Sequence, residues 1–146
     1  MKSSVVFRNK LLGSTGFAEI FPSGFLIALY TGAAPATPEA ATSGTLLGTV
    51  SLTGGGGGLI TDPPVDGMVI RPSAAVWTCL SLVAAGVIGY GRIYKVGDAY
   101  ATADSTKDRI DFTIGVSGSG ADMTVKSTTY ALGEAFQLNN FAYSLL

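Results

Sequence analysis

The chain lacks histidine altogether and has a single cysteine, Cys79, among its 146 residues. The absence of histidine removes the residue most often used as a general base, a metal ligand and a pH switch. One cysteine cannot form a disulfide within the chain, and Cys79 lies in an apolar segment that predicts an inert core thiol. These absences point away from catalysis and from a fold held by disulfides or metal.

Charged residues are also scarce. Lys, Arg, Asp and Glu make up 13% of the chain, against about 25% in an average soluble domain. A monomer this poor in charge exposes apolar patches, and such patches usually mark interfaces. The net charge of −1 lacks the basic excess of a nucleic-acid-binding domain. The composition therefore predicts a surface that contacts other protein subunits, with no direct nucleic-acid partner.

Long apolar runs are missing as well. The longest mostly apolar segment, residues 79–90, is too short for a spanning helix of about 20 residues. Three basic residues near the N-terminus suggest a signal peptide, but Gly13, Gly16 and Glu19 interrupt the apolar stretch behind them. We therefore expect no membrane span, no export signal and an intracellular site of synthesis.

The segments that are present predict an all-β fold in a single domain, either a β-sandwich or a small barrel. Short apolar runs bounded by glycine, proline and polar residues are typical of strands, and seven of them suit these architectures. The seven candidate strands are residues 25–30, 46–52, 74–82, 87–96, 109–116, 123–127 and 135–145. We expect segments 74–82 and 87–96 to pair with each other.

Two of these segments carry patterns that predict which side chains face the core. In 109–116, the alternation predicts Ile110, Phe112, Ile114 and Val116 inside and Arg109, Asp111 and Thr113 in solvent. In 87–96, Ile88, Tyr90, Arg92 and Tyr94 are expected to share one face. Gly89 and Gly91 on the other face predict a close backbone approach, such as that of an aromatic side chain from a neighbouring strand.

Two segments outside the strands are candidates for contacts with other subunits. Residues 1–16 form either a short helix, capped by Ser3 or Ser4 and ended by Gly13, or a mobile arm before the β domain at 17–146. Residues 54–67 form an exposed, mobile loop, because five successive glycines lose much entropy when ordered. The expected contact residues are Val5, Phe7, Arg8, Lys10, Leu11, Gly56, Pro63 and Pro64.

No motif indicates an enzyme, and we assign no catalytic, cofactor-binding or metal-binding residue. The glycines at 54–58 lack the Lys-Ser/Thr pair and the helix of a phosphate-binding loop. Calcium-loop spacing is absent from the aspartates, which are expected to be solvated: Asp104, Asp108, Asp111 and Asp122. Trp77 and the aromatic residues at alternating strand positions are expected to pack in the core, although they could also anchor an interface.

Several short segments follow one another in a recognisable order. They are FRNKLL (7–12), FLIALYTGAAPA (25–36), ATSGTLLGTV (41–50), Trp77 followed by AGVIGYGRIY (85–94), GVSGSGADM (115–123) and FQLNNFAYSL (136–145). In this order, over nearly the whole chain, they resemble a group of small virion structural proteins of tailed bacteriophages, of the capsid decoration or cement kind. The five-glycine run and Pro63-Pro64 depart from the pattern of that group.

The resemblance implies a non-catalytic subunit that decorates the phage capsid at junctions between major capsid subunits. Its partners would be the major capsid protein and copies of itself, expected as a trimer, on virions assembled in the bacterial cytoplasm. Two alternatives remain open. One is a tail or head–tail connector subunit, and the other is a carbohydrate-binding β-sandwich, which would need an exposed Trp or Tyr platform.

Overall fold

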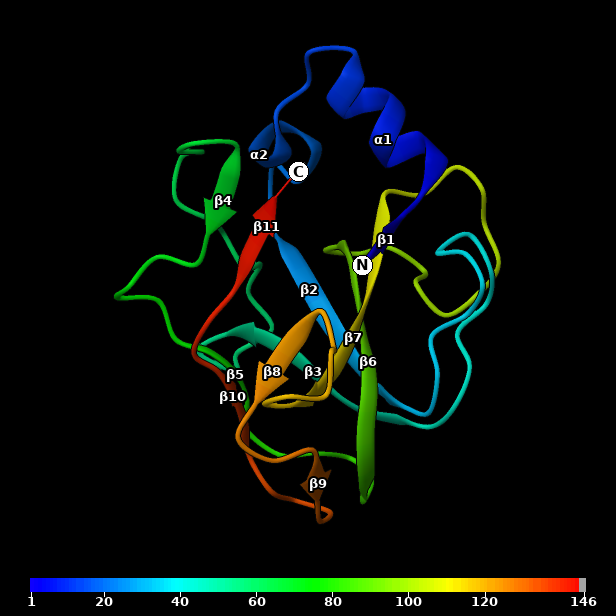
Figure 1. Cartoon of the computed structure of the whole chain (residues 1–146), viewed down its shortest axis with the longest axis vertical. Coiled ribbons are helices and arrows are strands. Elements are labelled where there is room, and N and C mark those ends of the chain that lie inside the picture. Colours follow the sequence, from blue (N-terminus) through cyan, green and yellow to red (C-terminus); the bar gives the residue numbers. More distant parts are fainter. Residues whose placement is uncertain (145–146) are drawn as a thin grey trace.

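Eleven strands and two short helices make up the fold in the computed structural model, which describes residues 1–144 (Figure 1). The all-β prediction is confirmed. The strands are β1 (Lys2–Ser3), β2 (Phe25–Thr31), β3 (Leu46–Leu52), β4 (Met68–Ile70), β5 (Trp77–Cys79), β6 (Gly86–Lys95), β7 (Arg109–Val116), β8 (Met123–Val125), β9 (Thr129–Tyr130), β10 (Phe136–Leu138) and β11 (Ala142–Ser144). The helices are α1 (Val5–Leu12) and α2 (Phe17–Ile20). Neither helix is long enough to cross a membrane, and no other helix occurs within residues 1–144.

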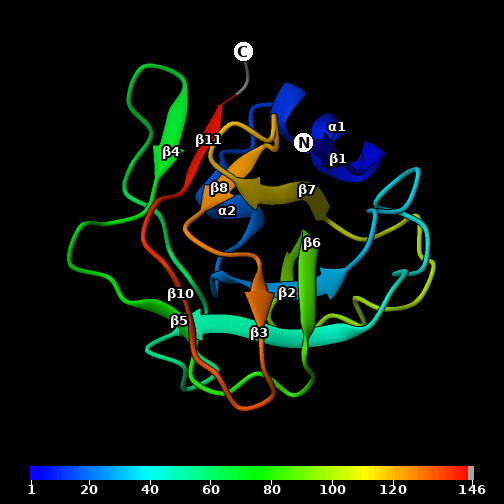
Figure 2. The same cartoon turned by 60° about the horizontal axis from the view of Figure 1, so that its bottom comes forward.

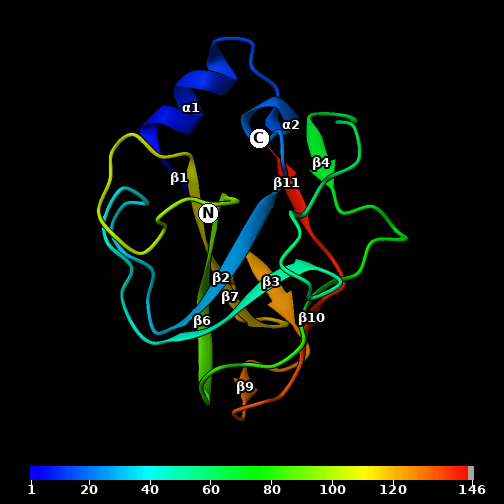
Figure 3. The same ribbon diagram turned by 180° about the vertical axis from the view of Figure 1, so that it is seen from behind.

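Nine strands form one sheet in the order β1-β7-β6-β2-β3-β5-β10, with β8 added to β7 and β9 added to β6. Only β8 runs parallel to its neighbour. Strands β4 and β11 form a second, two-stranded sheet, which lies with α1 and α2 at one end of the molecule (Figures 1 and 3). Phe7, Phe17, Val69 and Tyr143 from these elements join the main core. The arrangement is sandwich-like, because the long sheet forms one wall of the core and these elements help to form the other (Figure 2).

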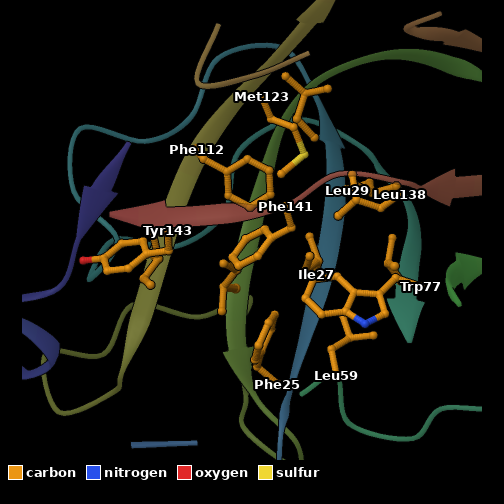
Figure 4. Close-up of a cluster of buried hydrophobic side chains, with 14 of the residues drawn as sticks. Phe25, Ile27, Leu29, Leu59, Trp77, Phe112, Met123, Leu138, Phe141 and Tyr143 are labelled. Atoms are coloured by element: carbon orange, nitrogen blue, oxygen red, sulfur yellow. The ribbon is translucent and has the colours of Figure 1, made fainter. Parts of the chain in front are cut away.

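The main core is built from aromatic and aliphatic side chains. Trp77 is fully buried, and its ring centroid lies 5.5 Å from that of Phe25 and 5.2 Å from that of Phe141. Figure 4 shows these rings converging from β2, β5 and the segment before β11. Cys79 is also buried, as a free thiol. The prediction of core positions for Trp77 and Cys79 is confirmed, and each large buried apolar side chain contributes about 1.5–3 kcal/mol to stability.

The predicted strands agree best with the observed strands where an apolar run is bounded by clear turn residues. Segments 25–30, 46–52, 87–96 and 109–116 correspond to β2, β3, β6 and β7 within one residue. Segment 74–82 contains only the three residues of β5, and 123–127 contains only the three of β8. Segment 135–145 divides into β10 and β11, and its last residue lies outside the described chain. The expected pairing of 74–82 with 87–96 is wrong, because β5 pairs with β3 and β10.

The glycines of β6 confirm the predicted close approach. A Cβ on Gly91 would lie 2.5 Å from Cζ of Phe112 on β7, and one on Gly89 would lie 1.9 Å from the carbonyl oxygen of Gly32. The β2–β6 register shifts at Gly89, because Tyr30 pairs with Tyr90 whereas the next residue of β2 pairs with Ile88. This bulge turns Ile88 into the main core, away from Tyr90. The prediction that Ile88 shares a face with Tyr90, Arg92 and Tyr94 is therefore wrong.

Candidate assembly surface

The long sheet buries charged side chains on the face opposite the main core. Arg92 and Asp111 form a fully buried bidentate pair, with Nε–Oδ1 and Nη2–Oδ2 distances of 2.7 Å. Arg109 is also fully buried, and its Nε lies 3.7 Å from a carboxylate oxygen of Asp98. The prediction that Arg109 and Asp111 face solvent is wrong, and Val116, expected inside, is exposed.

Two long loops, residues 32–45 and 96–108, cover this charged face. Arg92 Nη1 donates to the carbonyl oxygens of Ala40, at 2.8 Å, and Tyr100, at 3.0 Å. Arg109 Nη2 donates to the carbonyl oxygen of Ala99, at 2.7 Å. The two arginines thus hold the main chain of the covering loops, and a structural role accounts for their charges.

The helix α1 is tied to the same network through Asp108. The Nζ atoms of Lys10 and Lys95 lie 2.6 and 2.8 Å from Oδ2 of Asp108, whose side chain is almost completely buried. Lys10, expected as a contact with a neighbouring subunit, is therefore engaged within the chain. The expectation of solvated carboxylates is wrong for Asp108 and Asp111.

The N-terminal segment adopts the helical alternative rather than that of a mobile arm. Strand β1 pairs with β7, the hydroxyl of Ser4 accepts from the amide of Phe7 at 3.3 Å, and Gly13 ends α1. Phe7 is fully buried, with its ring 5.9 Å from that of Phe17 and 5.8 Å from that of Tyr143. Phe7 is therefore a core residue and is not accessible to a neighbouring subunit.

The other expected contacts on α1 separate into two grooves. Val5 and Arg8 are exposed and line a groove of about 640 Å³ between α1 and residues 36–39, which we call the Val5 groove. Its wall is held to the helix by Glu39, whose Oε1 accepts from the amide of Val5 at 2.6 Å. Burial opposes ionisation of Glu39, but this hydrogen bond and others hold its pKa below the usual value.

Leu11 lines a second groove, of about 250 Å³, together with Pro64. The two regions expected to make contacts, far apart in the sequence, thus meet between α1, α2 and β4. The exposed Met68 also lines this groove, and the exposed Leu12, Val65 and Ile70 lie within two residues of its lining residues in sequence; Leu12 is the most exposed of them at 87%. Pro63 lies exposed beside Pro64. We call this region the α1–β4 end, defined by Leu11, Leu12, Pro63, Pro64, Val65, Met68 and Ile70.

Gly56 lies on a different turn, directly after β3. The amide of Gly56 donates to the hydroxyl of Ser51 at 3.0 Å, and the amide of Leu52 donates to the carbonyl of Gly57 at 3.0 Å. The run is closely packed at its end, where a Cβ on Gly58 would lie 2.1 Å from the carbonyl oxygen of Ser23. Its exposure is confirmed at Gly56, whereas its mobility stays a prediction.

A second group of exposed aliphatic side chains was missed by the sequence analysis. Three of them lie on two connections, β5–β6 and β9–β10, and Val87 lies at the start of β6. Hydrogen bonds join the two connections: the amide of Leu82 donates to the carbonyl of Glu134, and the amide of Gly133 to that of Leu82, both at 2.8 Å. We call this region the β9 end, defined by Leu80, Val83, Val87 and Leu132. It lies opposite the α1–β4 end along the longest axis of the molecule (Figures 1 and 3). Isolated aliphatic residues in loops have no periodicity, so the sequence carries no signal for this patch.

Aromatic side chains contribute little to the exposed surface. All fourteen Phe, Tyr and Trp residues lie within residues 1–144, and all are buried except Tyr100 and Tyr130, which are half-buried. Tyr94 stacks on Tyr100 with ring centroids 4.1 Å apart, and burial raises the pKa of Tyr94. Residues 1–144 also contain no group of three His, Cys, Asp or Glu side chains that could hold a metal ion. The grooves and the two ends described above therefore present aliphatic side chains and a few charged groups to a partner.

No family model, curated protein or solved structure was found to match this chain.

Proposed function

We propose that this chain is a non-enzymatic structural subunit of a phage virion, which decorates the capsid by binding at junctions between major capsid subunits. The observation that carries the proposal is an inverted distribution of side chains. Five charged side chains are at most 5% exposed, whereas fourteen large aliphatic residues of the described chain are exposed. The five charged residues are Arg92, Asp98, Asp108, Arg109 and Asp111.

Contact with neighbouring subunits would remove the exposed aliphatic side chains from water. Removing apolar surface from water stabilises a complex by about 25 cal/mol per Å², before the cost of association is subtracted. A subunit that binds only the assembled lattice stabilises it by RT ln(1 + [L]/Kd) at each site, and contacts with several capsid subunits add avidity. We assign the capsid contact to the Val5 groove, which the exposed Val5 and Arg8 of α1 both line.

Rebinding to stripped phage heads tests this proposal. Virions of the phage that encodes the chain are expected to contain it by mass spectrometry, and heads stripped at low salt are expected to recover it from solution. Val5→Gln is expected to weaken rebinding, whereas Val96→Gln, a change at a similarly exposed valine outside the groove, is expected to leave it unchanged. Absence of the chain from virions, or equal rebinding of the two variants, would contradict the proposal.

The two alternative functions require different surface features. A tail or head–tail connector subunit could use the two opposite apolar ends for stacking, and electron microscopy of virions carrying a tagged chain separates tail from head. A carbohydrate-binding module needs an exposed aromatic platform, whereas the aromatic side chains within residues 1–144 are all buried except the half-buried Tyr100 and Tyr130. The structure therefore favours a virion subunit over a sugar-binding module.

A further inference from the structure

Three charged side chains have no hydrogen-bond or ion-pair partner within residues 1–144. They are Asp62, Asp66 and Lys126. The remaining sixteen of the nineteen charged residues each bind another side chain, a main-chain group or the terminal amine. Most charged side chains of this protein have a partner within the chain. The unpaired ones are therefore candidates for contacts with another molecule.

The two unpaired carboxylates lie at the α1–β4 end. Asp62 and Asp66 flank Pro63-Pro64-Val65, and the amide of Asp62 donates to the carbonyl oxygen of Ile70 at 2.9 Å. No Lys or Arg occurs from position 11 to position 70, and the basic residues that flank this range are engaged elsewhere: Lys10 with Asp108, and Arg71 with the carbonyl oxygens of Ala75 and Asn139. This end therefore combines aliphatic side chains with negative charge.

The unpaired ammonium group lies at the other end. Lys126 is exposed on the segment that joins β8 to β9, and Thr129, three residues later, pairs with Val87 of the β9 end. Leu132, which is 68% exposed, follows β9. Figures 1 and 3 place β9 at the pole opposite α1 and β4. The carboxylate of Glu134 at this end accepts from the amide of Ala131, which leaves Lys126 as the unpaired charge beside the aliphatic side chains of the β9 end.

We infer that copies of this chain associate head to tail, with the α1–β4 end of one copy on the β9 end of the next. The inference deepens the proposed function, because it names a second copy as the partner at these two surfaces. Apolar side chains are buried on both sides of the interface, and Lys126 meets the carboxylates of Asp62 and Asp66. Two α1–β4 ends facing each other would bring four carboxylates together, and like charges across an interface oppose association.

The proposed interface is heterologous, since it joins two different surfaces. Such an interface generates a closed ring when its rotation closes, and an open filament when it does not. Because the two surfaces lie at opposite poles of the molecule, repeated contacts extend along its longest axis, which favours an open chain or a large ring over the trimer that the resemblance implies. Salt screens charges at the rim of an interface, so association is expected to weaken, without disappearing, as ionic strength rises.

Charge reversal at either end tests the inference by sedimentation velocity of the purified full chain. One variant is Lys126→Asp, and the other combines Asp62→Lys with Asp66→Asn. Asparagine is chosen at position 66 because Asp66 has a φ of 50°, a left-handed conformation that asparagine adopts readily and lysine does not. Each variant alone presents like charges at its interface, so its dissociation constant is expected to rise at least about tenfold. The two variants attract each other at both ends, so an equimolar mixture is expected to assemble with the variants alternating.

Lys2→Asp is the matched control, because it changes the net charge as Lys126→Asp does, but at a lysine that contacts the carbonyl oxygen of Pro35. It is expected to sediment as wild type, and circular dichroism verifies that all variants fold. A monomeric wild type, a Lys126→Asp variant that assembles normally, or a mixture that recovers nothing would each overturn the inference. A chain that assembles as described but is absent from virions would contradict only the proposed function, and a monomer found in virions only the inference.

Discussion

The buried pair between Arg92 and Asp111 allows a direct test of how the charged face of the sheet is stabilised. Asp111→Asn preserves the shape of the side chain but removes the counter-charge of a guanidinium group that has no exposure to solvent. Removing one member of a buried ion pair costs about 3–5 kcal/mol, because the other charge stays buried without compensation. This is a large part of the total of about 5–15 kcal/mol that stabilises a typical domain.

Urea denaturation followed by tryptophan fluorescence measures this loss. Trp77 is the only tryptophan and is fully buried beside Phe25, so its emission reports on the integrity of the core. The Asp111→Asn midpoint is expected to fall with an unchanged slope, as for a change in stability alone. In thermal unfolding, a domain of about this size loses about 2–4 °C for each kcal/mol, so the expected shift is about 10 °C.

Two further variants show whether the reasoning is correct. Asp104→Asn changes a carboxylate on the covering loop that accepts only from the nearby Thr106, and its midpoint is expected to match wild type. Arg92→Met combined with Asp111→Leu removes both charges, and is expected to cost less than the sum of the two single changes. An Asp111→Asn variant as stable as wild type, or a double variant whose loss equals or exceeds that sum, would refute the argument.

Three other predictions concern the core and the tyrosine cluster. Phe7→Ala is expected to lower the free energy of unfolding by about 3–5 kcal/mol in urea titration, because the ring is fully buried; the exposed Leu12 is the control, and equal losses at both would contradict the packing of α1. Gly91→Ala is expected to cost about 1–3 kcal/mol by crowding Phe112, and Phe112→Leu in the same chain is expected to recover part of the loss; no recovery would contradict the contact. Burial raises the pKa of Tyr94 above its model-compound value of 10.0, so the folded state binds the phenolic proton more tightly than the unfolded chain does. Stability is therefore expected to be constant up to about pH 10 and to fall above it; Tyr94→Phe should reduce this alkaline loss, measured by urea titration at several pH values, and an unchanged pH profile would contradict the assignment.

The strands were predictable from sequence where local signals are complete. Strands β3 and β7 begin and end at the predicted residues, because apolar runs there are bounded by glycine, serine and charged residues. Pairing was not predictable for β5, since its neighbours β3 and β10 come from distant parts of the chain. The predicted orientation of the Ile88 side chain is wrong for a related reason. A single extra residue at Gly89 reverses the alternation, and no local pattern marks a bulge.

The candidate surface was partly predictable. Leu11 and Pro64 were identified separately, and only the fold brings them to one groove. Phe7 was assigned to a contact because an apolar residue on a short helix looks the same whether it packs on its own domain or on a neighbour. The sequence carries no signal for the β9 end, because its aliphatic residues come from two separate connections and from the start of β6.

The buried charges show most clearly what alternation can and cannot predict. The pattern in β7 correctly separates Ile110 and Phe112 from Arg109 and Asp111, but it shows only that the two faces differ in polarity. It does not show that the polar face is exposed to solvent. Two loops that are far apart in the sequence cover the charged face. The charged groups beneath them hold these loops through hydrogen bonds and are not exposed to solvent. The outer surface is therefore poorer in free charge than the 13% composition indicates. Because Lys126 is the unpaired charge at the β9 end, reversing it is expected to have a measurable effect on assembly.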